Sequence, residues 1–224
     1  MNTHTHIHAH THTLSENIIY RIARRLWRIF FPPPTLEQLA ELKKKEDYDF
    51  LLSCGVETEY GYVTLCGKPQ ITKHPNARII IEKGVTMVSS SYYNEAGISH
   101  PTILAAMTPG AIIILREGVG VSGVSIVANE YIEIGAQTMV GANANIYDND
   151  FHALDAEERL AGNKGKHSPV IIGEKCWIGA NTTILKGVHI GNEAVVGTMS
   201  LVNKDIPSKV LAAGVPAKVI RKIN

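Results

Sequence analysis

The chain has 224 residues, of which 45% are hydrophobic and 19% charged, and this is enough to bury the core of one domain with appended segments. Its formal net charge is +1 without a dense basic stripe, which argues against nucleic acid as a partner. Three scattered cysteines do not make a disulfide framework or a zinc site, and no run of about 18 apolar residues could span a membrane, so we expect a cytoplasmic protein that requires no metal.

The first segment, residues 1–13, carries histidine at positions 4, 6, 8, 10 and 12. In an extended strand this spacing would place five imidazoles on one face, where they could chelate a transition metal. Nothing in the segment would form a packed core, however, and a disordered low-complexity tail is the simpler interpretation.

The segment 14–50 is expected to be helical, beginning with a helix over residues 16–31. Four arginines fall on one arc of that helix and apolar residues spread over the rest, and the three prolines at 32–34 would end it. The basic stretch 18–31 could lie in the interface of an anionic membrane, which would bring the protein to the membrane's inner face. Alternatively, its apolar side could pack on the main domain.

A second helix is predicted to begin after Thr35. Thr35 and Gln38 have the spacing of a capping box, in which two side chains satisfy backbone donors at a helix start. Lys43, Lys44 and Lys45 would then lie near the carboxyl end, where the helix dipole favours cations.

From about residue 60, aliphatic residues recur at every sixth position. An α-helix repeats every three or four positions and a strand every two, so neither accounts for this period. A parallel β-helix does, because each short strand turns one aliphatic side chain inward and three strands make a triangular coil. We therefore predict such a domain over residues 51–206, followed by a tail over 207–224. The clearest members of the repeat are Ile172, Ile178, Ile184, Ile190, Val196 and Val202.

The same phase can be followed upstream, with a one-residue insertion between Val121 and Ile134 and a ragged pattern before residue 110. Its members there are Ile81, Met87, Leu115, Val121, Ile134, Val140 and Ile146.

The repeat is interrupted after Ile146. The next inward position would be residue 152, which is a histidine, and the register returns only at Ile172. Residues 151–168 are polar and contain glycine, so we predict that they form a loop leaving the coil. A long loop on a rigid repeat scaffold is commonly functional, which makes His152 the leading candidate residue.

Two segments carry a family resemblance: IYDNDFHALDAEER at 146–159, and VIIGEKCWIGANTTILKGVHIGNEAVVGTMSLVNKDIPSKVLAAGVPAKVIRKI at 170–223. They resemble the hexapeptide-repeat O-acetyltransferases, above all those that modify capsule, exopolysaccharide and lipopolysaccharide sugars, with the maltose and galactoside acetyltransferases nearby. VGVSG at 119–123 resembles the same polysaccharide-modifying branch. The resemblance spans about residues 61–224. It implies a left-handed parallel β-helix, a homotrimer with active sites between adjacent coils, acetyl-CoA in the groove and a loop histidine as base.

The chemistry agrees with that role for His152. A sugar hydroxyl must lose its proton as it attacks a thioester, and a neutral imidazole is abundant and basic enough to take it directly, without an acyl-enzyme. Asp150 could orient the imidazole or could be a solvated turn residue. Ser122, at a hexad corner, is a candidate donor to the oxyanion or contact for the substrate.

The candidate contacts to acetyl-CoA lie in the carboxyl-terminal coils. Gly179 and Ala180 are small corner residues that would let the pantetheine arm approach the backbone. Trp177 could line the cleft, or could belong to the core or to a trimer interface.

Further contacts to acetyl-CoA are expected after these corners. Thr198 and Asn203 occupy family positions that contact the pantetheine arm or the adenine end. Lys204, Lys218 and Arg221 could pair with the CoA phosphates, or could be ordinary surface charges.

The sequence leaves three other functions open. The γ-class carbonic anhydrases share this architecture and bind zinc with three histidines; His152, His167 and His189 are available, but they lack the spacing those enzymes use. A trimer without catalytic activity, recruited to membranes by the basic helix, is a second alternative. A xenobiotic acetyltransferase is a third, although DNDFH at 148–152 resembles the sugar-modifying branch more closely.

Overall fold

The computed structural model describes residues 34–223. The histidine-rich segment 1–13 and the basic helix expected over 18–31 lie outside the described residues. The chain divides into two compact units, Met1–Lys43 and Lys44–Asn224, and the second holds the β-structure. Within residues 34–223, no helix combines the length and the apolar character needed to cross a membrane.

Helix α2 (Leu36–Ser53) begins with the predicted capping box. The Thr35 amide donates to Gln38 Oε1 at 2.8 Å, and the Gln38 amide donates to Thr35 Oγ1 at 3.1 Å. The helix is longer than expected, so the three lysines at 43–45 lie near its middle and not near its carboxyl end. Gly55, in the left-handed region, ends it, because its amide and that of Val56 bond back to the last turn.

The strands form three sheets that are the three sides of a coil. The eight-stranded face contains, in order, β1 (Thr64–Cys66), β4 (Thr86–Val88), β7 (Gly120–Ser122), β10 (Met139–Val140), β13 (Trp177–Ile178), β16 (Val195–Val196), β18 (Val210–Gly214) and β19 (Ala217–Lys222). The six-stranded face contains β17 (Leu201–Val202), β14 (Thr183–Ile184), β11 (Asn145–Tyr147), β8 (Ser125–Ala128), β5 (Ile103–Ala106) and β2 (Gln70–Lys73). The five-stranded face contains β15 (His189–Ile190), β12 (Val170–Ile172), β9 (Tyr131–Ile134), β6 (Ile112–Leu115) and β3 (Arg78–Ile81).

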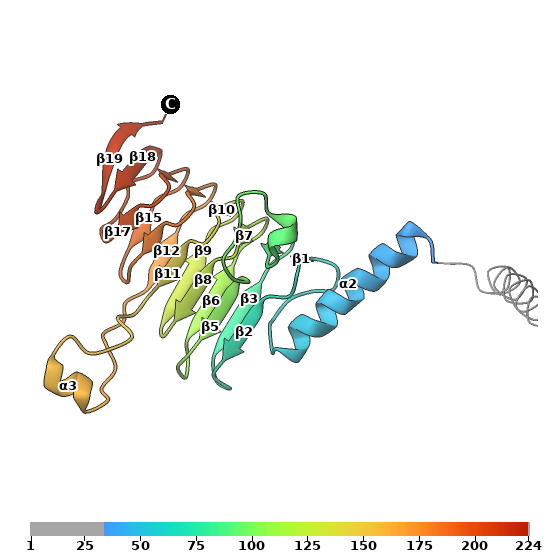
Figure 1. The fold of residues 1–224 in the computed structure, drawn as a ribbon, viewed down its shortest axis with the longest axis horizontal. Helices are drawn as coiled ribbons and strands as arrows, with labels where there is room; N and C mark the ends of the chain where they lie inside the picture. Colours follow the sequence, from blue (N-terminus) through green and yellow to red (C-terminus); the bar gives the residue numbers. More distant parts are fainter. Residues whose placement is uncertain (1–33, 224) are drawn as a thin grey trace, which may run out of the picture. The chain divides into compact units, whose positions relative to one another are not determined.

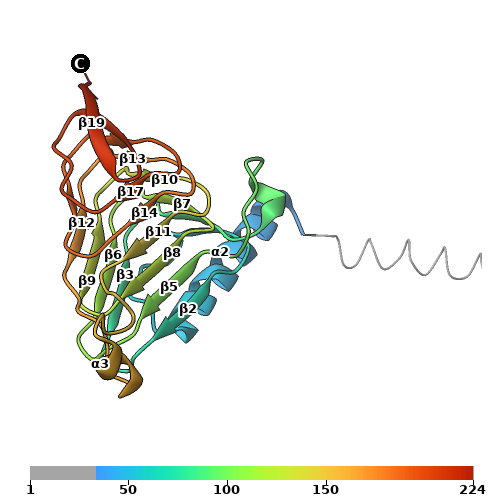
Figure 2. The same cartoon turned by 60° about the vertical axis from the view of Figure 1, so that its left-hand side comes forward.

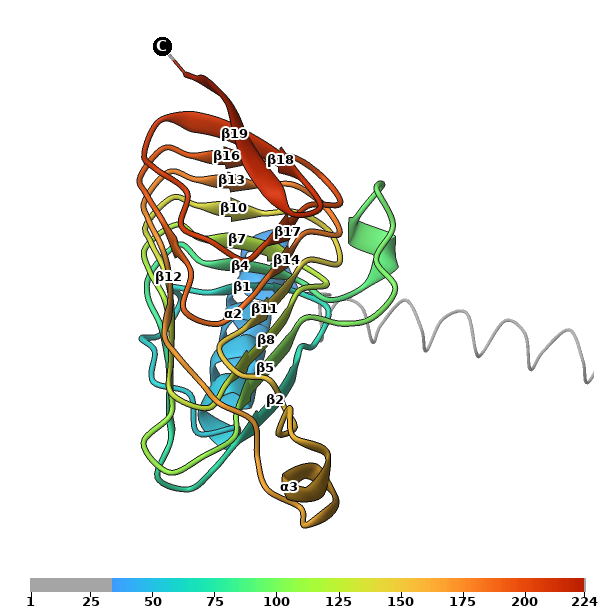
Figure 3. The same cartoon turned by 90° about the vertical axis from the view of Figure 1, so that its left-hand side faces the viewer.

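From β1 to β17, consecutive strands step from one face to the next, and each strand pairs in parallel with its counterpart one coil away. Figures 2 and 3 show the coils stacked from β1 to β18. This is the predicted left-handed parallel β-helix. Residues 207–224, expected as a tail, contain a further rung: β18 pairs in parallel with β16, and β19 folds back antiparallel onto β18.

The predicted inward residues are the core. All six members of the clearest repeat, from Ile172 to Val202, are at most 1% exposed. The upstream members pair with them in register, as Val121, Val140 and Ile178 do on the eight-stranded face. Ile81 and Met87 are also buried, so the coils extend into the ragged region. Because each coil buries its apolar side chains against its neighbours, stability accumulates along the stack.

The insertion in the repeat is held by a buried carboxylate. The spacing from Val121 to Ile126 is one residue shorter than the six-residue period. The spacing from Ile126 to Ile134 is two residues longer than that period. The extra residues make a turn at Asn129 and Glu130. Asp148, fully buried one coil away, accepts hydrogen bonds of 2.7, 2.7 and 2.9 Å from the amides of residues 129, 130 and 131.

Two segments leave the coil. One follows β4 and contains the short helix η1 (Ser91–Tyr93). The other lies between β11 and β12 and contains the short helix α3 (Ala156–Leu160), which protrudes from the coil in Figure 1. The second segment is the loop predicted from the break in the repeat.

Candidate functional site

The α3 loop rises from a two-stranded stem. Asn149 and His167 form an antiparallel bridge. The Asp150 amide donates to the Lys166 carbonyl at 3.0 Å, and the Ser168 amide donates to the Asp148 carbonyl at 2.8 Å. The two ends of the loop are therefore tied together before the chain re-enters the coil at β12.

His152 is exposed on this stem and does not point into the coil. The six-residue period would have turned residue 152 into the coil, but the chain has already left the coil after Tyr147. Phe151, just before it, has a φ of 59°, in the left-handed region. That conformation is supported by Asn149 Oδ1, which accepts from the Phe151 amide at 2.9 Å, and by edge-to-face packing of the Phe151 ring on Tyr147. The imidazole is thus presented to solvent from a braced backbone.

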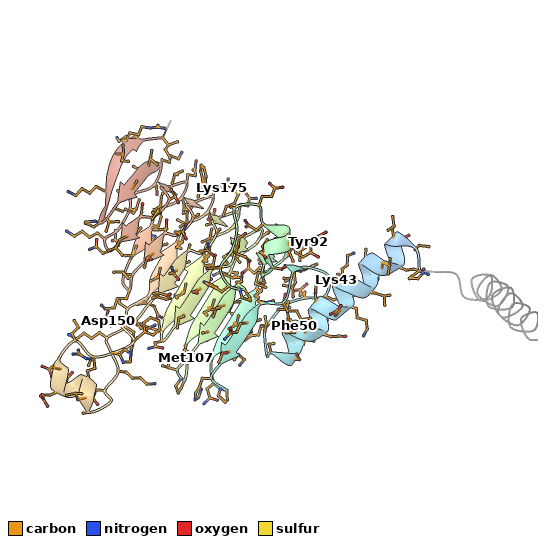
Figure 4. All side chains as sticks on the ribbon, viewed as in Figure 1. Lys43, Phe50, Tyr92, Met107, Asp150 and Lys175 are labelled. Carbon is orange, nitrogen blue, oxygen red and sulfur yellow. The ribbon has the colours of Figure 1, made fainter. Side chains whose placement is uncertain are left out.

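Asp150 contacts Lys186 and not the His152 ring. Lys186 Nζ lies 2.6 Å from Asp150 Oδ1, and both side chains are largely buried. Asp150 Oδ2 is buried without a hydrogen-bond partner among the described residues. Figure 4 shows Asp150 at the base of the loop. Asp150 therefore braces the stem through Lys186, and no hydrogen bond joins its carboxylate to the His152 ring. That Asp150 orients the imidazole stays a prediction.

Gly165 allows the stem to close. A Cβ placed there would lie 2.5 Å from the His152 carbonyl oxygen and 2.6 Å from Asp150 Cβ. Such distances are shorter than van der Waals contact, so the returning strand approaches the His152 segment as closely as glycine permits.

The other two acidic residues near His152 have structural partners. Asp148 holds the turn at 129–131. Asp155 caps α3, since its Oδ1 accepts from the amides of Glu157 and Glu158 at 2.9 and 3.0 Å.

Ser122 lies at the corner where the eight-stranded face passes to the six-stranded face, and it is half-buried. It precedes β8, whereas His152 follows β11, and β8 and β11 are parallel neighbours. Ser122 and His152 therefore stand at opposite ends of the six-stranded face, and the structure does not bring them together within one chain.

The corner occupied by Ser122 also holds Gly179, Ala180 and Thr198. A Cβ on Gly179 would lie 2.4 Å from the Thr198 amide nitrogen, so this glycine is required by the stacking of coils. Thr198 Oγ1 donates to the Ala180 carbonyl at 2.6 Å. Lys218 lies on β19 opposite Ala213, which continues the same corner one coil further on. The structure thus gathers four of the candidate acetyl-CoA contacts at or beside one corner.

The remaining cofactor candidates are placed elsewhere. Asn203 and Lys204 follow β17, at the next corner of the coil, and both are exposed. Arg221 is exposed on β19. Trp177 is 56% exposed on the outside of the eight-stranded face beside Met139, which excludes a place in the core of the chain.

The three histidines considered as zinc ligands do not converge within one chain. His167 Nδ1 lies 2.8 Å from Glu130 Oε2, and His189 lies on β15 of the five-stranded face. Among residues 34–223, no three His, Cys, Asp or Glu side chains are grouped to hold a metal ion.

Sequence reasoning missed two polar features. On the five-stranded face, Arg116 bonds to Glu82 at 2.8 Å and to Glu133 at 2.6 Å, and Tyr131 donates to Glu133. Burial and the bond to Glu133 raise the pKa of Tyr131 to about 12. Burial would raise the pKa of Glu133, but the bonds from Arg116 and Tyr131 outweigh it and lower that pKa. The only signal of this network in the sequence is the presence of charged residues at outward positions of these strands.

The second missed feature is the segment between β4 and β5. It borders a shallow hollow of about 260 Å³, open to solvent and lined by Ser89, Ser90, Ser91, Ile98, Ser99, His100 and Pro101. The run SSSYYNEAGISHP at 89–101, rich in hydroxyl groups, was the available signal.

Known proteins are similar to parts of this chain. The hexapeptide repeat of succinyl-transferase matches residues 169–198. Galactoside O-acetyltransferase of Escherichia coli K12 is 39% identical over 100 residues, which cover 45% of this chain and 48% of that protein. A protein of the same strain, provisionally named a lipopolysaccharide biosynthesis O-acetyl transferase, is 34% identical over 108 residues. These residues cover 45% of this chain and 55% of that protein. The chain thus spans about half the length of these relatives.

A solved structure is similar over a longer span. The maltose O-acetyltransferase of Clostridium difficile 630 is 27% identical, with 91% of this chain and 86% of that one covered and a TM-score of 0.52. The six-residue period and the coil that it builds thus make this chain similar in sequence and fold to hexapeptide-repeat proteins that are named acetyltransferases.

Proposed function

We propose that the protein transfers the acetyl group of acetyl-CoA to a hydroxyl group of a sugar or glycan, with His152 as the general base. The observation that carries this proposal is the exposed His152 on a braced stem at an interruption of the hexapeptide coil. A base on a rigid loop can meet an incoming hydroxyl without first reorganising its own backbone.

The reaction needs two proton transfers, one to His152 from the acceptor hydroxyl and one from His152 to the CoA sulfur. Neutral His152 takes the proton of the acceptor hydroxyl as its oxygen attacks the thioester carbonyl carbon. A hydrogen-bond donor must then face the oxyanion, and Ser122 is the candidate for this role. When the carbon–sulfur bond breaks, the proton on His152 passes to the departing CoA sulfur. The base is thereby restored and no acyl-enzyme forms.

The corner with Gly179, Ala180 and Thr198 is the proposed track for the pantetheine arm. Its side chains are small, so the arm can lie close to the backbone, and exposed Lys218 beside it can pair with a phosphate. Trp177, exposed on the adjoining face, can line the same track. Asn203, Lys204 and Arg221 are assigned to the outer parts of CoA.

The separation of this corner from His152 within one chain supports an oligomer whose site lies between protomers, and the family resemblance makes that oligomer a homotrimer. The base stands at one end of the six-stranded face and the proposed acetyl-CoA corner at the other. A second copy of the chain can place its corner beside the first copy's His152, which completes a site between protomers.

The acceptor class rests on the named relatives. One is named for galactosides and one for lipopolysaccharide biosynthesis, and the similar solved structure is named for maltose. A sugar hydroxyl is the acceptor that these names share, and the relative named for lipopolysaccharide biosynthesis supports a role in modifying a polysaccharide or its precursor.

A thiol-release assay with acetyl-CoA and a panel of sugars and oligosaccharides tests the activity. We expect His152→Ala to lower kcat by about 10²–10⁴-fold with little change in CoA affinity. His189→Ala is the matched control, since His189 is also exposed but lies on the five-stranded face. Wild-type turnover in His152→Ala would disprove the assignment of the base.

A further inference from the structure

The serine loop, residues 89–101, joins β4 to β5 and lines the open hollow of about 260 Å³. Four serines and one histidine line this hollow, and none of its lining residues is a lysine, an arginine or an acidic residue. Such a lining offers hydrogen bonds without charge. It suits a neutral ligand with many hydroxyl groups better than a phosphate.

The serine loop is braced by neighbouring coils. A Cβ on Gly67 would lie 2.9 Å from Ser90 Cβ, and one on Gly123 would lie 2.8 Å from Ile98 Cβ, so two corners press against the base of the loop. Asn143 Oδ1 accepts from the Ser99 amide and hydroxyl at 2.8 and 3.1 Å. These contacts hold the hollow open in advance of binding, which lowers the entropy lost when a ligand binds.

Several polar atoms of the hollow remain available. His100 Nδ1 lies 2.8 Å from the Pro101 carbonyl oxygen. A carbonyl only accepts, so Nδ1 carries the hydrogen and Nε2 of the neutral ring is left as an acceptor. Ser91 is exposed, and among residues 34–223 its hydroxyl has no hydrogen-bond partner. The hollow therefore presents both a donor and an acceptor to a ligand.

Aromatic surface adjoins these groups. Tyr92 and Tyr93 are 87% and 57% exposed, and their rings pack edge to face at 5.1 Å. Figure 4 shows Tyr92 on the outer side of the loop, away from the coil. Tyr92 and Tyr93 do not line the hollow, but they directly follow Ser91, which does. An exposed ring at this point of the loop can cover the apolar face of a sugar ring while the hollow binds its hydroxyl groups.

The place of the loop in the fold connects it with acetyl transfer. The serine loop leaves β4 at the corner that Ser122, Gly179 and Thr198 also occupy. Taking this position with the neutral lining and the exposed tyrosines, we propose that the serine loop is a subsite for a neutral sugar unit of the acceptor. The identity of the ligand as an acceptor rests on the proposed function; the affinity of the loop for a neutral sugar does not.

Kinetics with maltose and methyl β-D-galactopyranoside test the subsite. We expect Ser91→Ala and Tyr92→Ala each to raise the KM for the sugar about fivefold, the value of one lost hydrogen bond or contact, while the KM for acetyl-CoA stays at its wild-type value. Both side chains are exposed, so neither change should disturb folding. Tyr62→Ala, at an exposed tyrosine outside the loop, is the control. An unchanged KM for the sugar in the double variant Ser91→Ala, Tyr92→Ala would overturn the subsite.

His100→Gln separates binding from catalysis. As a binding residue, His100 should affect the KM for the sugar. If the variant instead lost kcat at an unchanged KM, His100 would be a base and the subsite assignment would be wrong.

Saturation-transfer NMR of the same two sugars on the full chain measures binding without turnover. Loss of the signal in Tyr92→Ala would support the subsite even if no acetyl transfer were found, in which case only the proposed function would fail. No binding of either sugar to the wild-type protein would overturn the subsite, whatever the outcome of the transfer assay.

Discussion

Lys186 Nζ lies 2.6 Å from Asp150 Oδ1, and this ion pair joins the base of the α3 loop to the next coil of the β-helix. Lys186 follows β14, which stacks directly on β11, the strand from which the loop departs. The side chains are 30% and 21% exposed, so solvent screens the pair less than it would a surface pair. The pair therefore fixes the backbone that carries His152.

Replacing Lys186 by methionine is expected to loosen the stem without unfolding the coil. Asp150 would be left with neither oxygen paired in a largely buried position, which we expect to cost about 1–2 kcal/mol. Turnover should fall because His152 is less well positioned, whereas CoA affinity should stay the same. Limited proteolysis of the loop and kinetic assays measure the two effects.

The double variant Lys186→Met, Asp150→Asn is the control for this pair. It removes the uncompensated charge, so part of the lost stability should return. If Lys186→Met alone left proteolysis and turnover at wild-type values, the ion pair would have no role in holding the stem.

The period of six made the coil predictable from the sequence. Each short strand between Ile172 and Val202 buries one aliphatic side chain in the core. The aliphatic residues therefore recur once per strand, and this regular spacing is visible in the sequence. The loop was predictable for the same reason, since an interruption is visible against a regular pattern. The longer α2 and the rung at β18 were missed because they lack that pattern.

The partners of polar side chains could not be predicted in the same way. Asp148, Asp150 and Asp155 lie close together in the sequence, yet one holds a turn, one pairs with Lys186 and one caps a helix. Each partner except that of Asp155 lies in a different coil, and the sequence spacing between coils changes wherever residues are inserted. The same holds for the serine loop, whose bracing residue Asn143 is far along the chain.

Asp148→Ala is expected to destabilise the protein strongly. It removes a fully buried carboxylate that accepts three backbone hydrogen bonds, and it leaves three donors at the turn unsatisfied. Hydrogen bonds to a charged acceptor are the stronger kind, so we expect a loss of about 3 kcal/mol or more. Denaturant unfolding measures it. Asp155→Ala, which removes only an exposed helix cap, should cost about 1 kcal/mol, and equal losses in the two variants would contradict the role of Asp148.

The network on the five-stranded face predicts a loss of stability in acid. The pKa of Glu133 is lowered in the folded protein, below its ordinary value of 4.5. Its contribution is thus fully present above pH 4.5 and is lost as the pH falls through the lowered folded value. Glu133→Gln should be less stable than the wild type at neutral pH, and this difference should shrink below pH 4.5. Unfolding at several pH values tests it, with exposed Glu95→Gln as the control; a difference that does not change with pH would contradict the prediction.

Gly165→Ala tests whether the close packing of the stem matters for catalysis. The new methyl group would lie 2.5 Å from the His152 carbonyl oxygen and 2.6 Å from Asp150 Cβ, so one strand of the stem must move. The core lies elsewhere, and we expect the midpoint of thermal unfolding to change little. Turnover should fall because the displaced segment is the one that presents His152, and a shift of the base by about 1 Å can cost about 10²-fold. Gly162→Ala in the same loop is the control for added bulk, since nothing lies within 4 Å of its Cβ position, although its φ of 80° adds backbone strain. Full turnover in Gly165→Ala would show that the position of His152 does not depend on this contact.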